Sequence, residues 1–200
     1  MNSYPAHGST ALFLVLSGPS GSGKSTLMTA FMQRRPDFVR CLSVTTRPPR
    51  GSERDGVDYH FVDEAEFLRR VEAGAMLEHA QVFGKHRYGT LRSVVEGHVA
   101  AGRGVIKDMD VQGAAQVRVS FPAAVHIFVV PPTRADIEQR LRGRGTDAPE
   151  IIARRLAEAD HELARWRDYD YLVVNDTVDR AVGDLETIVI AERLRIARPQ

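Results

Sequence analysis

The sequence predicts an α/β fold in which a mainly parallel sheet is flanked by helices, and three observations point to it. Short apolar runs typical of buried parallel strands alternate with segments of helical periodicity along most of the chain. A glycine-rich loop joins the first apolar run to the first helical segment. Between residues 41 and 90, shorter alternating stretches carry more polar and aromatic residues, which indicates a small mixed-sheet lobe inserted into the main fold.

The elements follow in order from these patterns. The runs that predict strands of the main sheet are residues 12–16, 105–109, 125–130 and 171–174. The segments with helical periodicity are residues 24–34, 64–73, 90–101, 133–142, 149–165 and 179–196. Within the inserted lobe, the alternating stretches are residues 41–45, 58–62 and 76–82. Two capping boxes, Thr133-x-x-Asp136 and Asp147-x-x-Glu150, mark the starts of the fourth and fifth helices.

Length and composition suit one globular domain. The chain has 200 residues, of which 43% are hydrophobic and 26% are charged. A formal net charge of +1 argues against broad electrostatic binding to nucleic acid or to a membrane surface. No run approaches the roughly 20 apolar residues of a membrane span, and the single cysteine, Cys41, is expected to be a buried filler. We therefore expect a cytoplasmic protein with a flexible leader at 1–9 and one domain at 10–200.

The glycine-rich loop is the most specific feature. It reads Gly18-Pro19-Ser20-Gly21-Ser22-Gly23-Lys24-Ser25 and fits the pattern G-x-x-x-x-G-K-[ST] between a strand and a helix. Glycines let several N–H groups turn inward around an anion, and the N-terminus of the following helix adds its dipole. Lys24 can reach the β- and γ-phosphates of a nucleotide, and the Ser25 hydroxyl can bind Mg²⁺. The loop predicts a nucleoside triphosphate site.

A second set of polar residues indicates another anion site. Arg47 and Arg50 lie three residues apart on a segment stiffened by two prolines, so that both guanidinium groups can converge on one anion. The chain then offers an alternating strand around Tyr59. Asp108 and Asp110 follow at the carboxyl end of a predicted strand, the edge at which α/β sheets bind ligands.

Eight motifs in order give the chain a resemblance to the guanylate kinase family, from about residue 12 to about residue 192. The matching pieces are GPSGSGKST, SVTTRPPR, DGVDYHF, LEHAQVFG, YGT, DMDVQGA, RLRGRGTD and VVND. The resemblance implies a P-loop NTPase core, a small mixed-sheet GMP-binding lobe and a short lid. It also implies direct in-line transfer of the γ-phosphoryl group from ATP, with Mg²⁺, to GMP.

Within this resemblance, one group of residues is implied to hold GMP. The matching residues are Ser43, Arg47, Arg50, Tyr59, Glu78, Tyr88, Thr90 and Asp110. The arginines and tyrosines would hold the GMP phosphate, since a dianion favours guanidinium and hydroxyl donors. The others would read guanine. A carboxylate suits the N1–H and N2–H₂ donors of guanine, whereas adenine would leave a buried acceptor unsatisfied.

A second group is implied to bind ATP and to assist transfer. The ATP-binding residues are Gly18, Pro19, Ser20, Gly21, Ser22, Gly23, Lys24, Ser25, Thr26 and Asn175, the last of these beside adenine. The catalytic residues are Lys24, Arg47, Arg140, Arg144 and Arg155. Ser25 and, through water, Asp108 are the implied Mg²⁺ ligands. Lys107 is expected on the opposite face of its strand, because side chains alternate along a strand.

The resemblance also divides the domain. It implies a core at 10–40 and 102–200, the GMP lobe at about 41–100 and the lid at about 140–156. The chain is one residue longer than the family pattern in the loop 84–87, and the effect of that residue on Tyr88 is left open. Whether the protein is a monomer or a homodimer and whether it accepts dGMP are also open.

Two alternatives remain. Some scaffold proteins carry a guanylate-kinase-like domain that binds peptides without phosphoryl transfer, although such domains typically lack an intact phosphate loop. A related kinase that acts on another phosphorylated acceptor, such as a ribose phosphate, is the second alternative. The guanine-reading residues Ser43, Glu78, Thr90 and Asp110 argue against it.

Overall fold

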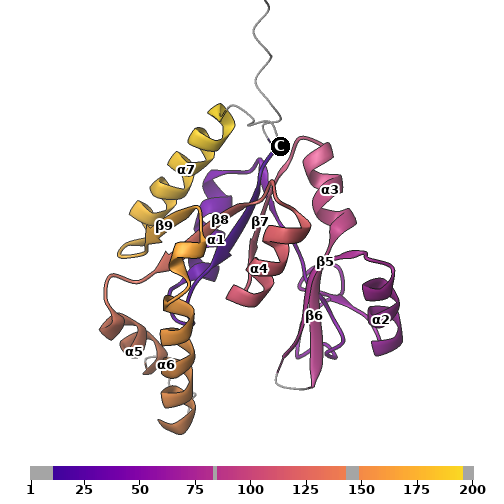
Figure 1. Ribbon diagram of the computed structural model, residues 1–200, viewed down its shortest axis with the longest axis horizontal. Coiled ribbons are helices and arrows are strands. Elements are labelled where there is room, and N and C mark those ends of the chain that lie inside the picture. The colour runs from indigo at the N-terminus through magenta and orange to yellow at the C-terminus, as the bar shows by residue number, and fades with distance from the viewer. Residues whose placement is uncertain (1–10, 83–84, 143–148, 196–200) are drawn as a thin grey trace, which may run out of the picture.

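The structure is a computed structural model that describes residues 11–82, 85–142 and 149–195. The predicted leader at 1–9 lies outside the described residues. Figure 1 shows two sheets that lie beside one another, a larger one with helices on both faces and a smaller one next to α2 and α3. The predicted α/β class with an additional mixed sheet is confirmed.

The larger sheet has five parallel strands in the order β2-β7-β1-β8-β9. Its strands are β1 (Phe13–Ser17), β2 (Phe38–Arg40), β7 (Gly104–Asp108), β8 (Val125–Val130) and β9 (Tyr171–Val174). β1 lies in the middle and is buried at every position, as expected for a strand covered on both faces. The three-residue edge strand β2 was not predicted, because so short a run has no periodicity. Cys41 is buried as expected, but it follows β2 rather than lying in a strand.

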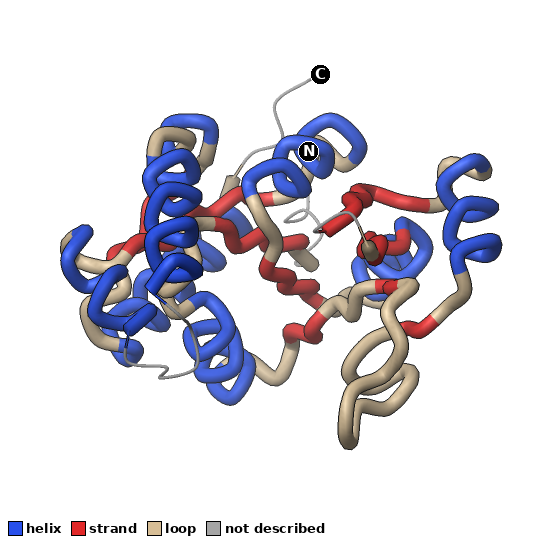
Figure 2. The backbone as a smooth tube through the Cα atoms, turned by 90° about the horizontal axis from the view of Figure 1, so that it is seen from below, coloured by secondary structure: helices blue, strands red, loops and turns tan. Residues whose placement is uncertain are grey.

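Helices cover both faces of this sheet (Figure 2). On one face, α1 (Lys24–Arg34) and α7 (Val178–Leu194) pack on side chains such as Leu14 and Ile127. On the other face, α3 (Arg92–Ala100) and α4 (Val111–Ser120) pack on Phe13 and Val15. α4 was not predicted from the sequence, because it has an internal Gly113 and weak apolar periodicity. Its start is nevertheless marked, since the Asp110 carboxylate accepts a hydrogen bond of 2.7 Å from the Gly113 N–H.

The smaller sheet has the order β4-β3-β6-β5. Its elements are β3 (Val44–Thr45), β4 (His60–Phe61), β5 (Met76–Val82) and β6 (His86–Leu91), with α2 (Glu64–Glu72) packed through Phe67. β3 and β4 are parallel and the other pairs are antiparallel, so the predicted mixed lobe is confirmed. The helix expected at 90–101 begins only at Arg92, because β6 pairs with β5 through Leu91 and keeps Thr90 in a strand.

A helix pair projects from the core on the same lower side of Figure 1 as the β5–β6 hairpin. α5 (Arg134–Arg142) and α6 (Pro149–Leu163) meet through Ile137 and Ala159, and Arg134 forms two 2.7 Å hydrogen bonds to Asp160. The first capping box is confirmed, with Asp136 N–H donating to Thr133 Oγ1 at 3.2 Å. Part of the predicted lid, 143–148, and with it Asp147 of the second capping box, falls outside the described residues. No helix in the described ranges is long and apolar enough to cross a membrane.

His126 on β8 is a buried histidine outside the predicted site. It is 1% exposed, and its Nε2 has no hydrogen-bond partner among the described residues. It lines a cavity between α4 and the turn Trp166–Asp168, together with Arg118 and Tyr169. Burial, with the nearby Arg118 charge, lowers the pKa of His126 to about 4, whereas Asp170 opposes that shift.

This lowered pKa predicts a pH-dependent stability. Below about pH 6.5 the unfolded chain binds a proton at His126 that the folded chain does not, so the stability falls as the pH drops toward about 4. We expect a loss of about 2 kcal/mol in the free energy of unfolding between pH 7 and pH 5. Urea unfolding at both pH values measures it. His126→Gln should flatten the dependence, whereas the same change at His161, exposed on α6, should not. If the free energy of unfolding depends on pH equally in both variants, His126 is not the source of the pH dependence.

Candidate nucleotide-binding site

Three glycines of the loop between β1 and α1 have positive φ angles, and at Gly18 and Gly23 a side chain would also meet a neighbouring atom. Gly18 has φ 135°, and a Cβ there would lie 2.1 Å from the Val129 carbonyl oxygen. Gly23 has φ 86°, and a Cβ there would lie 2.4 Å from Asn175 Nδ2. Both conformations are unfavourable for residues with a side chain, and both contacts are too close for one. The loop is therefore pressed against β8 and the end of β9.

Lys24 and Ser25 begin α1 at the mouth of this loop. Lys24 Nζ donates to the carbonyl oxygens of Gly18 at 2.5 Å and of Pro19 at 3.1 Å. The loop and the first turn of α1 line a cavity whose residues are Ser20, Gly21, Gly23, Lys24, Ser25 and Thr26. A lysine, a helix N-terminus and turned backbone N–H groups together favour a bound polyphosphate.

Ser25 and Asp108 form a pair suited to Mg²⁺. Ser25 Oγ donates to Asp108 Oδ2 at 3.3 Å, across the gap between α1 and the end of β7. A hydroxyl and one carboxylate are the hard oxygen donors that Mg²⁺ takes from proteins, with phosphates and water completing the octahedron. The residues present therefore fit the ion that the sequence predicts.

Asn175 and Arg140 brace the phosphate loop. Asn175 is 4% exposed and donates from Nδ2 to the Ser22 carbonyl oxygen at 2.8 Å. Arg140 on α5 donates to the Asn175 carbonyl oxygen at 3.0 Å and to that of Ser22 at 3.4 Å. These contacts assign Asn175 a loop-bracing role, and its place beside adenine stays a prediction. Arg155 lies half-buried on α6, and Arg144 lies outside the described residues.

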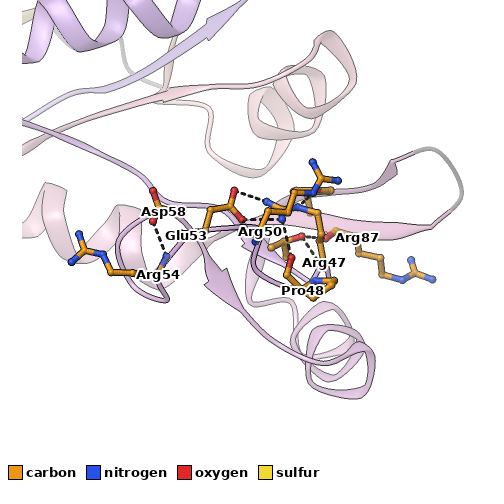
Figure 3. A network of polar contacts seen from close by, with 9 residues as sticks. Arg47, Pro48, Arg50, Glu53, Arg54, Asp58 and Arg87 are labelled. Carbon is orange, nitrogen blue, oxygen red and sulfur yellow. Dashed lines mark hydrogen bonds and ion pairs between the residues drawn. The ribbon is translucent and has the colours of Figure 1, made fainter. Parts of the chain in front are cut away.

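Arg47 is the centre of a polar network in the smaller lobe (Figure 3). Its side chain is 4% exposed, and its two terminal nitrogens donate to the two carboxylate oxygens of Glu53 at 2.9 Å. Its Nε donates to the Tyr88 hydroxyl at 3.1 Å, and its guanidinium carbon lies 5.2 Å from the centre of the Tyr59 ring. The Glu53 carboxylate raises the pKa of Arg47, and Arg47 in turn lowers the pKa of Glu53.

This network gathers three of the predicted phosphate ligands around Arg47. The Tyr59 and Tyr88 rings lie 6.1 Å apart in an edge-to-face arrangement, and the Arg47 guanidinium group contacts both. Arg50 is exposed, and its backbone N–H donates to Glu53 at 2.8 Å, which fixes the turn that carries it. Glu53 was not singled out from the sequence. It could have been found as a candidate partner of Arg47, because it is an acidic residue within a stretch that contains several arginines.

Glu78 forms the buried end of a cavity between the two sheets. It is 8% exposed, and Thr90 Oγ1 donates to its Oε1 at 2.5 Å. Burial raises the pKa of Glu78, while Thr90 and the charge of Lys107 oppose that rise. The cavity has a volume of about 150 Å³, and its lining residues are Ser43, Glu78, Ala80, Tyr88, Lys107, Asp108, Met109 and Asp110. Four predicted GMP-binding residues thus surround one space.

Lys107 also lines this cavity, which the sequence analysis did not predict. Side chains alternate at the end of β7 as predicted: Asp108 contacts Ser25 on one face of the strand, and Lys107 contacts Ser43 on the other. The opposite face is not outside the site, however, because the smaller lobe covers it. Lys107 Nζ there donates to Ser43 Oγ at 2.6 Å.

The cavity around Glu78 and the phosphate loop are neighbours. A further cavity is lined by Gly18, Ser20, Lys24, Asp108, Met109, Asp110 and Glu162. It shares the segment 108–110 with the cavity around Glu78, so the end of β7 borders both spaces. Burial raises the pKa of Glu162, which the sequence analysis missed, and the charge of Lys24 opposes that rise. Two anions bound on either side of 108–110 would meet beside Lys24.

Comparison with known proteins decides the family. The family model for guanylate kinase matches residues 11–192, nearly the whole chain. The chain belongs to the guanylate kinase family. The guanylate kinase of Alkalilimnicola ehrlichii is 47% identical over 186 residues, which cover 93% of this chain and 91% of that protein. The guanylate kinase of Anaeromyxobacter dehalogenans is 50% identical over 188 residues, with coverages of 93% and 83%.

A solved guanylate kinase shares the fold. The crystal structure of the enzyme from Anaplasma phagocytophilum superposes with a TM-score of 0.73 at 34% identity, and covers 94% of this chain and 88% of its own. Membership of the guanylate kinase family therefore extends over both sheets. It confirms the family that the eight sequence motifs indicated.

Proposed function

We propose that this protein transfers the γ-phosphoryl group of ATP directly to GMP, giving ADP and GDP, and so supports guanine nucleotide synthesis and recycling. The observation that carries the proposal is the buried Glu78–Thr90 pair in a cavity that borders the phosphate loop through residues 108–110. Membership of the guanylate kinase family supports the same reaction.

On the donor side, the phosphate loop and Lys24 bind the ATP phosphates. Turned N–H groups and the α1 N-terminus hold the chain of phosphates, and the ammonium group of Lys24 neutralises charge on the β- and γ-phosphates. Ser25 and, through water, Asp108 would hold Mg²⁺, which would supply further charge neutralisation at the transferring group. Asn175 keeps the loop in shape through its bond to Ser22.

On the acceptor side, the network around Arg47 receives the GMP phosphate. Arg50 and the hydroxyls of Tyr59 and Tyr88 supply the donors that a phosphate dianion favours. Most N–H groups of the Arg47 side chain already donate hydrogen bonds to Glu53, Tyr88 and Pro48. Its contribution is therefore to hold the tyrosines in place as well as to attract the phosphate.

The transfer itself needs positioning and charge neutralisation rather than a general base. The attacking oxygen belongs to an already anionic phosphate, so no proton has to be removed before transfer. Arg140, Arg144 and Arg155 offset the charge of the transferring group when the lid and the lobe close. Closure also excludes water and so limits ATP hydrolysis. A cytoplasmic location fits two soluble nucleotide substrates and stays a prediction.

Replacement of Glu78 tests base recognition. In Glu78→Gln, the amide NH₂ faces guanine donors, and one hydrogen bond to a charged acceptor is lost. We expect kcat/KM for GMP to fall about 100-fold and the preference for GMP over AMP to shrink by a similar factor. Steady-state kinetics with both nucleotides measure the change. An unaltered preference would show that guanine is read elsewhere.

The proposed reaction is tested by ADP release from MgATP with a panel of acceptors. The panel contains GMP, AMP, CMP, UMP and ribose 1,5-bisphosphate. Rapid turnover with GMP alone is the expected result. Tight GMP binding without turnover would favour a binding module, and turnover only with the sugar phosphate would favour the related kinase.

A further inference from the structure

A buried lysine lies where the larger sheet meets the cavity around Glu78. Lys107 is 4% exposed and follows Val105 and Ile106, which are fully buried in the same strand. Removing an ammonium group from water costs several kcal/mol unless the group is paired and hydrogen-bonded. An apolar side chain would continue the strand at no such cost. The charge at this position therefore points to a role in the adjoining cavity.

The contacts of Lys107 fix the direction of a hydrogen bond. Its Nζ donates to Ser43 Oγ at 2.6 Å and to the Cys41 carbonyl oxygen at 3.4 Å. An ammonium group has donors and no acceptor. Ser43 Oγ must therefore accept from Lys107, and its own proton is left to donate to another group. In the cavity around Glu78, Ser43 thus acts as a donor.

Another part of the cavity lining has the opposite polarity. Glu78 is an acceptor, and a Cβ on Gly113 would lie 3.2 Å from Glu78 Oε2 and 3.4 Å from Asp110 Oδ1. Both carboxylates thus lie close to Gly113, and the negative charge of Asp110 raises the pKa of Glu78. Lys107 is the cationic side chain among the described residues that line this cavity. Its charge favours the ionised, acceptor-only form of Glu78.

We infer that Lys107 is a positioning residue for base selection, which fixes the Ser43 hydroxyl as a donor to the O6 edge of guanine. Guanine presents an acceptor at O6 and donors at N1 and N2, which match a donor at Ser43 and an acceptor at Glu78. Adenine presents a donor at its 6-amino group, which would face the Ser43 proton. This inference rests on the proposed function and adds a residue to its specificity.

The test uses a substrate that differs from GMP only at position 6. In 6-thio-GMP a sulfur, which is a weak acceptor, replaces O6, while the N1 and N2 donors remain. In the wild type we expect kcat/KM for GMP to exceed that for 6-thio-GMP about 10-fold, because the loss of one hydrogen bond changes the binding free energy by about that factor. Lys107→Met and Ser43→Ala should each reduce that preference to about two-fold, mainly through the KM for GMP.

Coupling and conservative variants separate positioning from simple folding support. The double variant Lys107→Met/Ser43→Ala should be no less selective than Ser43→Ala alone, since both changes remove the same bond. Lys107→Arg keeps a donor-only cation and should retain the preference, while the KM for MgATP stays unchanged throughout. Lys85→Met, the same change at an exposed lysine, should behave as the wild type.

Several results would overturn the inference. Equal losses on GMP and 6-thio-GMP in Lys107→Met, or full additivity with Ser43→Ala, would show that Lys107 does not act through Ser43. If Lys107→Met does not fold, Lys107→Gln replaces it, because an amide can accept as well as donate and so no longer fixes the Ser43 proton. If Lys107→Gln keeps the preference for GMP over 6-thio-GMP, Lys107 does not act through Ser43. A wild type that does not phosphorylate GMP would instead overturn the proposed function.

Discussion

Replacement of Lys24 by methionine is expected to lower kcat/KM for GMP phosphorylation by at least ~3 kcal/mol, roughly 100-fold or more. Lys24 is placed at the start of α1, where its Nζ lies against the Gly18 and Pro19 carbonyl oxygens. From there it would reach the β- and γ-phosphates, whose charge must be offset as the phosphoryl group moves. Methionine keeps the length of the side chain and removes the charge. The loss should appear in kcat as well as in the KM for MgATP.

The matched control is Lys85→Met, which makes the same change at an exposed position before β6. It should leave kcat/KM within about two-fold of the wild type, because surface changes of this kind cost little. Thermal unfolding of both variants should be close to that of the wild type. Near-normal turnover in Lys24→Met would contradict the role assigned to the phosphate loop.

Replacement of Arg47 by methionine should cost a similar amount, at least ~3 kcal/mol in kcat/KM. Two effects combine in this variant. It removes positive charge from the proposed site of the GMP phosphate, and it leaves the Glu53 carboxylate and the Tyr88 hydroxyl without their bonds to the buried guanidinium group. The KM for GMP should rise more than that for MgATP. Initial rates over a grid of both substrates measure the split.

Arg54→Met is the control for this prediction. Arg54 is exposed in the same loop, where its backbone N–H donates to Asp58 at 2.8 Å. This variant should retain activity. Tyr88→Phe separates the two effects, since it removes one hydroxyl of the proposed phosphate site and leaves the Arg47–Glu53 pair intact. If Arg47→Met turns over GMP normally, the assignment of this network to the acceptor phosphate is wrong.

The main sheet could be predicted because its strands are long and apolar. Runs such as 125–130 are buried on both faces and contain no competing helical period. The elements that were missed are those whose sequence has no clear period. α4 contains glycine and β-branched residues and depends on the Asp110 cap, and the residues of β6 were assigned in part to a helix. Tertiary pairing with β5 decides the latter.

The phosphate loop could be predicted because its chemistry is local in the sequence. The contacts that complete the site join residues far apart in the chain. Lys107 meets Ser43 only because the smaller lobe folds over the end of β7, and Asn175 meets Ser22 only because β9 lies beside β8. A strand pattern gives the side to which Lys107 turns, but not what covers that side. Glu53 likewise becomes a partner of Arg47 only once the loop closes.

A competition between GMP and AMP tests whether the protein uses ATP to phosphorylate GMP and whether it selects guanine. The protein is incubated with limiting MgATP and equal concentrations of GMP and AMP, and the nucleotides are separated by anion exchange. We expect GDP and ADP in equal amounts, with AMP unchanged. Consumption of AMP, or ADP formed without GDP, would contradict it.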